Sequence, residues 1–271
     1  MRWTEDIGHF QAGGASLEYA CFGPVPGDGP VIVLLHEGLG CVALWRDFPR
    51  ALAERTGCSV FVYSRAGYGR SDPVQLPRPL DYMTREATDV LPDVLDAIGA
   101  ASVILMGHSD GATIAAIYAG SVVDHRVRGL VLMAPHFFCE KMGLDAIRAA
   151  AAAYETGNLR DRLAKYHADV DGAFWGWNRA WLDPGFADWN VGEGIDSLRV
   201  PVLAVQGVED QYGTDAQISE IVDRAYCPVD VVMLEDCRHA PHEDQPEAVL
   251  VAVADFCERL QRIEAATVEM A

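Results

Sequence analysis

The sequence is poor in basic residues and has no long apolar run. Lys and Arg number 21 against 40 Asp and Glu, which gives a formal net charge of −19. This balance disfavours nucleic acids and anionic membranes as partners, because both carry the same sign of charge. No apolar run approaches the roughly 20 residues of a membrane-spanning helix. The first residues, MRWTED, lack the pattern of a secretory signal. We therefore expect a cytoplasmic protein with neither nucleic-acid nor membrane partners.

Paired cysteines are also missing. The seven cysteines are an odd number, lie scattered along the chain and form no CxxC pair. This pattern argues against a disulfide framework and against a zinc site. We expect reduced thiols and no bound metal.

Apolar residues, in contrast, are plentiful. They make up half of the 271 residues, enough for the core of one large α/β domain or two small ones. Short apolar runs alternate with segments of helical spacing, which predicts a mostly parallel sheet with helices on both faces. The expected strands lie at 15–22, 31–35, 59–63, 102–107, 127–135, 200–207 and 229–235, and the expected helices at 45–55, 84–99, directly after Gly111, and at 246–262.

One segment breaks this alternation. Between Pro135 and Val200 there is no strand pattern, only alanine-rich helix and a cluster of aromatic residues. Those aromatics either form the core of a helical insertion or line a pocket beneath it, and at least one of Trp175, Trp177 and Trp181 is a candidate for the pocket wall. We expect an α/β core of residues 1–135 and 200–271, and a helical cap of residues 136–199.

The most informative motif is Gly-x-Ser-x-Gly at Gly107, Ser109 and Gly111. It lies between an apolar strand and a helix rich in small residues. A chain that turns from strand to helix so sharply strains its middle residue and needs glycine on either side. Ser109 is thereby exposed at a helix start, where negative charge on an oxygen is favoured. Ser109 is the candidate nucleophile.

A serine nucleophile needs a base and an acid, which are expected in loops after later strands. Of the eight histidines, His239 and His242 lie in such a loop, and His239 is favoured because it is nearer the strand end. Glu209 and Asp210 are both candidates for the acid, whereas Asp215 suits the cap of the next helix. His108 is expected to point inward, and His9, His125 and His167 to lie at the surface.

The developing oxyanion needs two hydrogen-bond donors. The backbone amide of Asp110, directly after the nucleophile, is one candidate. The other is expected in the glycine-containing loop of residues 36–40, which follows an early strand.

Taken together, these motifs resemble the α/β-hydrolase superfamily over nearly the whole chain. They are Gly107–Gly111 as nucleophile elbow, His36–Gly40 as oxyanion loop, Arg65–Ser71 as glycine turn, Gln206–Asp210 as acid loop and His239–His242 as histidine loop. The order of nucleophile, acid and histidine is that of the superfamily. The resemblance implies the α/β-hydrolase fold, with Asp210 as the acid and His239 as the base.

The chain departs from the family at two positions. Glu37 and Ala66 stand where glycine is usual. By its third place in the oxyanion motif, Gly38 is expected to supply the second amide, with Leu39 as the alternative.

The implied chemistry is acyl transfer from a small carboxylic ester to water, without metal or cofactor. Hydrolysis of carbon–carbon bonds in meta-cleavage-type diketones is the main alternative, and amides, lactones and peracid formation remain open. A non-catalytic receptor for a small ligand is the alternative from another class.

Overall fold

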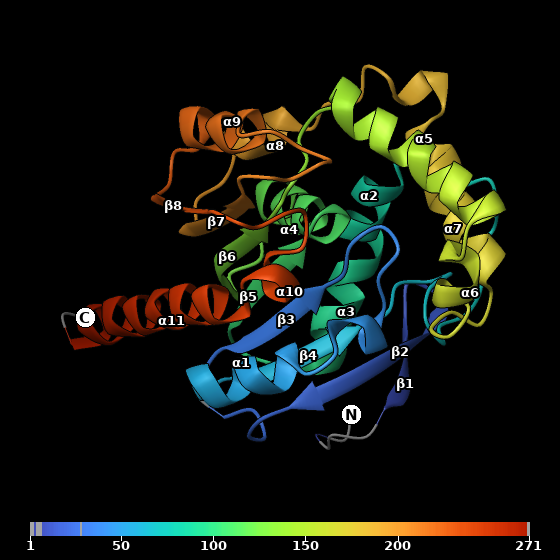
Figure 1. The fold of residues 1–271 in the computed structure, drawn as a ribbon. Coiled ribbons are helices and arrows are strands. Elements are labelled where there is room, and N and C mark those ends of the chain that lie inside the picture. Colours follow the sequence, from blue (N-terminus) through green and yellow to red (C-terminus); the bar gives the residue numbers. More distant parts are fainter. Residues whose placement is uncertain (1–2, 4–6, 28, 270–271) are drawn as a thin grey trace.

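The computed structural model describes residues 3, 7–27 and 29–269, and its centre is one eight-stranded sheet (Figure 1). The strand order is β1-β2-β4-β3-β5-β6-β7-β8. Strands β1 and β2 run antiparallel to their neighbours, and the remaining pairs are parallel. The strands are β1 (Gly8–Ala12), β2 (Ala15–Phe22), β3 (Val31–Leu35), β4 (Ser59–Tyr63), β5 (Val103–His108), β6 (Val127–Met133), β7 (Val202–Gly207) and β8 (Val229–Leu234).

All seven expected strands are present, with ends shifted by at most two residues. Helices cover both faces of the sheet, so every residue of β3, β4 and β5 is buried. The interior strands are therefore easy to recognise in the sequence as short apolar runs. Strand β1 was not expected. Its sequence, GHFQA, alternates between half-buried and exposed positions up to the buried Ala12 and carries little apolar signal.

Helices cover the two faces of the sheet. They are α1 (Phe48–Thr56), α2 (Tyr82–Arg85), α3 (Leu91–Ile98), α4 (Asp110–Ser121), α9 (Ala216–Arg224), α10 (Pro241–Asp244) and α11 (Pro246–Glu269). Successive residues of a strand point to opposite faces. Accordingly, Ile32 and Leu34 pack with α1 and α11, and Val33 packs on the other side with α3 and α4.

Two helix expectations need correction. The helix expected at 84–99 is divided into α2, a π-helical turn at Glu86–Val90 and α3. Pro92 lies just after the π-helical turn, in the first turn of α3. The helix expected at 45–55 begins at Phe48, after a 3-10 turn at Val42–Trp45.

Between β6 and β7 the structure is helical, as expected. This segment contains α5 (Lys141–Thr156), α6 (Leu159–Leu163), α7 (Val170–Trp181), η3 (Pro184–Phe186) and α8 (Gly192–Asp196). Figure 1 shows α5, α6 and α7 grouped together at one side of the sheet. Helix α8 instead lies against α4, where Gly120 allows the close approach of the Gly194 carbonyl. In the described part of the chain, no helix combines the length and apolarity that crossing a membrane requires.

Candidate active site

Ser109 occupies a strained turn between β5 and α4. Its φ is 53° and its ψ is −120°, a backbone conformation that non-glycine residues rarely adopt. The neighbouring glycines have a steric reason. A Cβ at Gly107 would lie 2.3 Å from the backbone nitrogen of Ala112, and one at Gly111 would lie 2.1 Å from the carbonyl oxygen of Leu35. Helix α4 therefore packs too close to the sheet for any side chain at either position.

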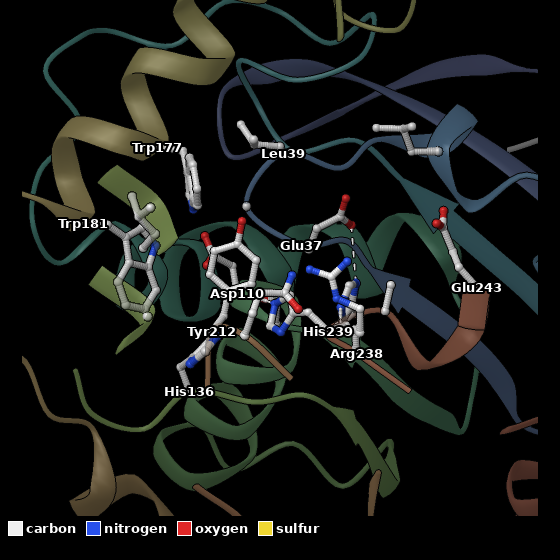
Figure 2. A pocket seen from close by; sticks show the side chains of 18 of the residues that line it. Glu37, Leu39, Asp110, His136, Trp177, Trp181, Tyr212, Arg238, His239 and Glu243 are labelled. Atoms are coloured by element: carbon white, nitrogen blue, oxygen red, sulfur yellow. Dashed lines mark hydrogen bonds and ion pairs between the residues drawn. The ribbon is translucent and has the colours of Figure 1, made fainter. Parts of the chain in front are cut away.

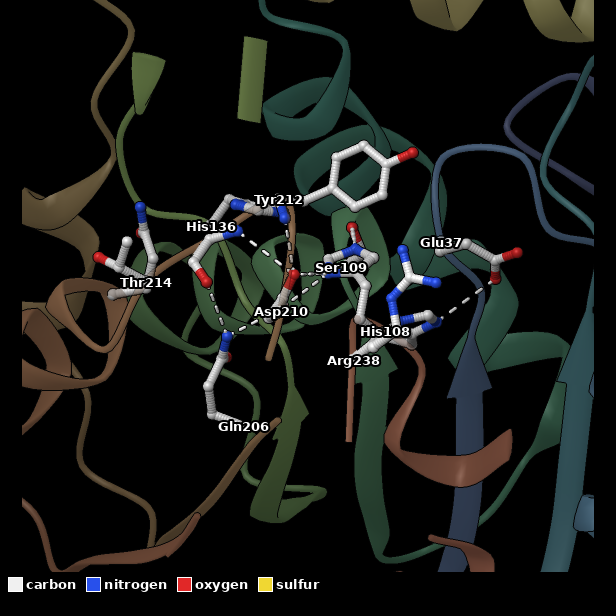
Figure 3. Close-up of polar contacts among 12 residues, drawn as sticks. Glu37, His108, Ser109, His136, Gln206, Asp210, Tyr212, Thr214 and Arg238 are labelled. Carbon is white, nitrogen blue, oxygen red and sulfur yellow. Dashed lines mark hydrogen bonds and ion pairs between the residues drawn. The ribbon is translucent and has the colours of Figure 1, made fainter. Parts of the chain in front are cut away.

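The structure brings Ser109, His239 and Asp210 into one hydrogen-bonded row. Nε2 of His239 lies 2.9 Å from Oγ of Ser109. On the other side of the ring, Nδ1 lies 2.9 and 2.8 Å from the two carboxylate oxygens of Asp210. The three residues follow β5, β8 and β7, whose carboxyl ends meet at the same edge of the sheet. Figure 3 shows Ser109 and Asp210 close to each other.

The competing candidates lie elsewhere. Glu209 is exposed. Asp215 occupies the residue before α9, but its side chain makes no capping hydrogen bond. His242 is buried, with its ring centroid 4.7 Å from that of Trp45. The hydrogen-bonded row therefore contains Asp210 and His239, whereas Glu209 and His242 lie outside it.

Asp210 is held in its charged form. Burial raises the pKa of this carboxyl, but the hydrogen bond from His239 and the backbone amide of Tyr212 outweigh burial and bring that pKa below its usual value. The Tyr212 amide lies 2.8 Å from Oδ1, and Nε2 of Gln206 lies 2.8 Å from Oδ2. An ionised Asp210 requires a proton on Nδ1 of His239, which leaves Nε2 free to accept the proton of Ser109.

Three further histidines lie near these loops. Burial lowers the pKa of His136 and that of His242 to about 3, so both are neutral. His167 was expected at the surface, and this expectation was wrong. It is buried, its Nδ1 accepts the Gly69 amide at 3.0 Å and its Nε2 donates to the Leu39 carbonyl at 3.0 Å. These contacts join loops far apart in the sequence, so no local pattern reveals them.

The oxyanion loop is oriented by Arg65, whose role the sequence did not suggest. The buried guanidinium donates to the carbonyls of His36 and Glu37, the second at 2.9 Å. His36 also donates from Nδ1 to the Glu37 carbonyl, at 2.7 Å. Since the Glu37–Gly38 peptide is trans, the Gly38 N–H points away from that carbonyl. Within the described residues, this N–H donates to no protein acceptor.

Gly38 lines a cavity of about 450 Å³ together with Ser109 and Asp110 (Figure 2). Trp177 and Trp181 of α7 form part of its apolar wall, which confirms the expectation that at least one of these tryptophans lines a pocket. Trp175 instead borders a different hollow. A Cβ at position 38 would lie 2.2 Å from Nε1 of Trp177, so α7 rests directly on the oxyanion loop.

The carboxyl of Asp110 is a further part of the wall. It is buried, and the Tyr82 hydroxyl donates to it at 2.5 Å while accepting a hydrogen bond from Nε1 of Trp181 at 3.0 Å. Burial raises the pKa of Asp110. Across the residues that the structure describes, no group of three or more His, Cys, Asp or Glu side chains has a metal-binding arrangement.

Comparison with known proteins agrees with this architecture. The model of the alpha/beta hydrolase family matches residues 32–253. Epoxide hydrolase B of Mycobacterium tuberculosis is 27% identical over 226 residues, which are 81% of this chain and 59% of that protein. The chain thus spans about three fifths of that relative's length.

Solved structures resemble the fold at lower identity. The enol-lactonase of Burkholderia xenovorans superposes with a TM-score of 0.71 and 20% identity, covering 92% of this chain and 99% of its own. The proline iminopeptidase of Mycobacterium smegmatis reaches a TM-score of 0.74 at 18% identity, covering 96% and 100%. At such identities the likeness concerns the fold alone.

Proposed function

This chain belongs to the alpha/beta hydrolase family, and we propose that it is a serine hydrolase that cleaves small carboxylic esters. The observation that carries the proposal is the unbroken hydrogen-bonded row from Ser109 through His239 to Asp210, with contacts of 2.8 to 2.9 Å. A serine hydroxyl is a weak nucleophile unless a base takes its proton, and this row supplies the base and the group that orients it.

The reaction proceeds in two halves. Oγ of Ser109 attacks the ester carbonyl while Nε2 of His239 takes the hydroxyl proton, and Asp210 stabilises the resulting imidazolium. The imidazolium then gives that proton to the departing alcohol, which leaves an acyl group on Ser109. Water enters, loses a proton to His239 and attacks the acyl carbonyl. This attack forms a second tetrahedral intermediate. When the intermediate collapses, the carboxylic acid is released and His239 returns the proton to Ser109.

The backbone amides of Gly38 and Asp110 are the proposed oxyanion donors. Asp110 is the first residue of α4, so its N–H has no partner within the helix. Gly38 lines the same cavity with an N–H that donates to no protein acceptor in the described chain. Each such donor contributes about 3 to 4 kcal/mol to transition-state binding in comparable sites.

A serine nucleophile also distinguishes the proposed ester hydrolysis from the epoxide hydrolysis that the name of the relative Epoxide hydrolase B indicates. Attack of Oγ on an epoxide forms an ether, and an ether offers water no carbonyl to attack. The enzyme would stay alkylated after one turnover. Attack on an ester forms another ester, which the same residues hydrolyse. The serine therefore favours acyl substrates over epoxides.

The cavity and the helices above it define the size of the substrate. A volume of about 450 Å³ lies at the lower part of the range for small-molecule sites. Because α7 contributes Trp177 and Trp181 to the wall, we assign residues 136–199 the role of a cap on a core of residues 1–135 and 200–271. The proposed partner is thus a small-molecule ester, with no cofactor needed for the chemistry.

Substitution of the nucleophile tests the proposal. In Ser109→Ala, hydrolysis of p-nitrophenyl acetate should fall by about 10⁵-fold or more, with the melting temperature nearly unchanged. A fluorophosphonate probe should label the wild type and leave this variant unlabelled. Ser121→Ala, at the exposed end of α4, is the matched control and should behave as the wild type.

The alternatives give different outcomes. An unlabelled wild type would indicate a ligand receptor. Faster turnover of a vinylogous diketone than of any ester would indicate carbon–carbon bond hydrolysis. Retention of ester hydrolysis by Ser109→Ala would remove Ser109 from the mechanism.

A further inference from the structure

Glu37 replaces a glycine that is usual in the oxyanion loop, and its side chain has a specific contact. Oε2 of Glu37 lies 3.6 Å from Nδ1 of His108, the residue before the nucleophile (Figure 3). The carboxylate fits because Gly40 has no side chain. A Cβ there would lie 2.3 Å from Oε2 of Glu37. The Glu37 side chain is 28% exposed, and that of His108 is 3% exposed.

His108 in turn contacts the proposed base. Its Nε2 lies 2.6 Å from the backbone carbonyl oxygen of His239. A carbonyl only accepts hydrogen bonds, so Nε2 of His108 must carry a proton. Glu37, His108 and the backbone of His239 therefore form a chain that links the oxyanion loop, the elbow and the histidine loop.

The protonation of this chain follows from its geometry. With Nε2 protonated, a neutral His108 would direct the lone pair of Nδ1 toward the Glu37 carboxylate, which is repulsive. Nδ1 lies within ion-pair distance of Oε2 of Glu37 and has no hydrogen-bond partner among the described residues. A second proton is therefore needed between Nδ1 and Glu37, and it converts His108 to an imidazolium paired with a carboxylate.

We propose that Glu37 is a positioning residue for the catalytic histidine, because its carboxylate keeps His108 doubly protonated and His108 in that form anchors the backbone of His239. The inference rests on the proposed function, in which His239 is the base. A hydrogen bond from a charged donor is stronger than one from a neutral ring. The imidazolium therefore fixes the His239 loop more firmly than neutral His108.

The surrounding groups agree with this charge state. Burial lowers the pKa of His108, but Glu37 outweighs burial and raises that pKa above its usual value. Burial raises the pKa of Glu37, and His108 brings it below its usual value. The other titratable groups near His108 in the described chain are His239, with a ring centroid 5.1 Å away, and His242 at 4.9 Å, followed by Asp210 and His136, which both lie next to His239.

These directions give the anchor a pH window. A raised pKa means that His108 keeps its proton as the pH rises past the ordinary histidine value of 6.5. The stabilisation is complete below that value and is lost as the pH rises through the raised pKa. Activity should therefore decline on the alkaline side, as His108 loses this proton.

Glu37→Gln tests the inference, because it removes the charge and keeps the shape. Histidine labelled with ¹⁵N reports the protonation of each ring nitrogen, and loss of a signal in His108→Asn identifies His108. In the wild type, both nitrogens should carry protons at pH 6.5. In Glu37→Gln, the second proton should be lost about one to three pH units lower. For p-nitrophenyl acetate, kcat at neutral pH should fall about three- to tenfold with little change in KM.

Glu247→Gln is the matched control. Glu247 is an exposed residue that pairs with Arg55 at 2.9 Å and does not line the cavity, so its loss should leave both the His108 titration and the alkaline decline in activity unchanged. Equal titration of His108 in the wild type and Glu37→Gln would overturn the inference, as would a wild-type His108 with one protonated nitrogen at pH 6.5. The titration is read without any substrate. It therefore stays informative if Ser109→Ala shows that the proposed function is wrong.

Discussion

Arg65 fixes the backbone of the oxyanion loop by hydrogen bonds to its carbonyl groups. Its guanidinium contacts two successive carbonyls, those of His36 and Glu37. Its planar fork suits two acceptors at once, whereas a lysine ammonium is a single point charge. The side chain is further fixed by Tyr68, whose ring centroid lies 5.2 Å from the guanidinium carbon. The direction of the Gly38 amide therefore depends on a residue that does not reach the substrate.

We predict that Arg65→Lys lowers kcat by about ten- to a hundredfold, because a displaced amide stabilises the oxyanion poorly. KM should change little, since the loss arises mainly in the transition state. The measurement is steady-state kinetics on p-nitrophenyl acetate, together with the affinity for a trifluoromethyl ketone that mimics the tetrahedral state.

Arg70→Lys provides the control, since Arg70 is an exposed residue of the same glycine turn. A raised KM and an unchanged inhibitor affinity in Arg65→Lys would contradict the prediction. That outcome would place Arg65 in substrate binding rather than in loop orientation.

The residues that sequence alone identifies are those fixed by short patterns. Ser109 lies in a five-residue motif, Asp210 follows the buried strand β7, and His239 follows the edge strand β8, in a known order. Arg65, His167 and the pair of Glu37 with His108 could not be identified in this way. Each acts through a contact between loops that are separated by 28 residues or more in the chain, and only folding brings these loops together.

At the scale of elements, the same reasoning explains which parts of the fold were predictable. Strands β3, β4 and β5 are buried throughout and almost entirely apolar, because both faces are covered. The edge strand β1 and the π-helical turn at Glu86–Val90 carry no such signal. Helix α11 continues to Glu269, beyond the apolar spacing that ends near Arg262.

Helix α7 and the oxyanion loop interlock through one close contact. A Cβ at Gly38 would lie 2.2 Å from Nε1 of Trp177. We predict that Gly38→Ala displaces either the loop or the indole and destabilises the protein by about 1 to 3 kcal/mol, with a larger relative loss of kcat. Addition of Trp177→Phe should restore part of both losses, because the smaller ring vacates the position of Nε1.

Denaturant unfolding and ester kinetics on the single and double variants measure this coupling. Gly194→Ala is a suitable control, because a Cβ there meets nothing within 4 Å. Strictly additive effects of Gly38→Ala and Trp177→Phe would show that the two positions do not interlock.

For the whole molecule, the dominant electrostatic feature is the excess of 40 acidic over 21 basic residues. Like charges repel one another in the compact state, and dissolved salt screens this repulsion. We predict that raising NaCl from about 0.01 to 0.15 M increases the melting temperature. The surface ion pairs, such as Arg126 with Asp96 at 2.7 Å, weaken under the same conditions, but each contributes little.

Differential scanning calorimetry at constant pH measures the effect. Sucrose of matched osmolality serves as the control, because it changes no electrostatic interaction. A melting temperature that falls with salt would mean that attractive pairs outweigh the net repulsion.

The order of strands in the sheet has a consequence for synthesis on the ribosome. Strands β3, β5 and β6 are neighbours in the sheet, and all three precede β7 and β8 in the sequence. On the ribosome, β7 and β8 are therefore synthesised last. A nascent polypeptide that has emerged only through β6 carries Ser109 on its elbow but neither Asp210 nor His239, the side chains that we propose activate it. In the proposed mechanism, hydrolytic competence therefore arises late in translation, after the loop that follows β8 has left the exit tunnel.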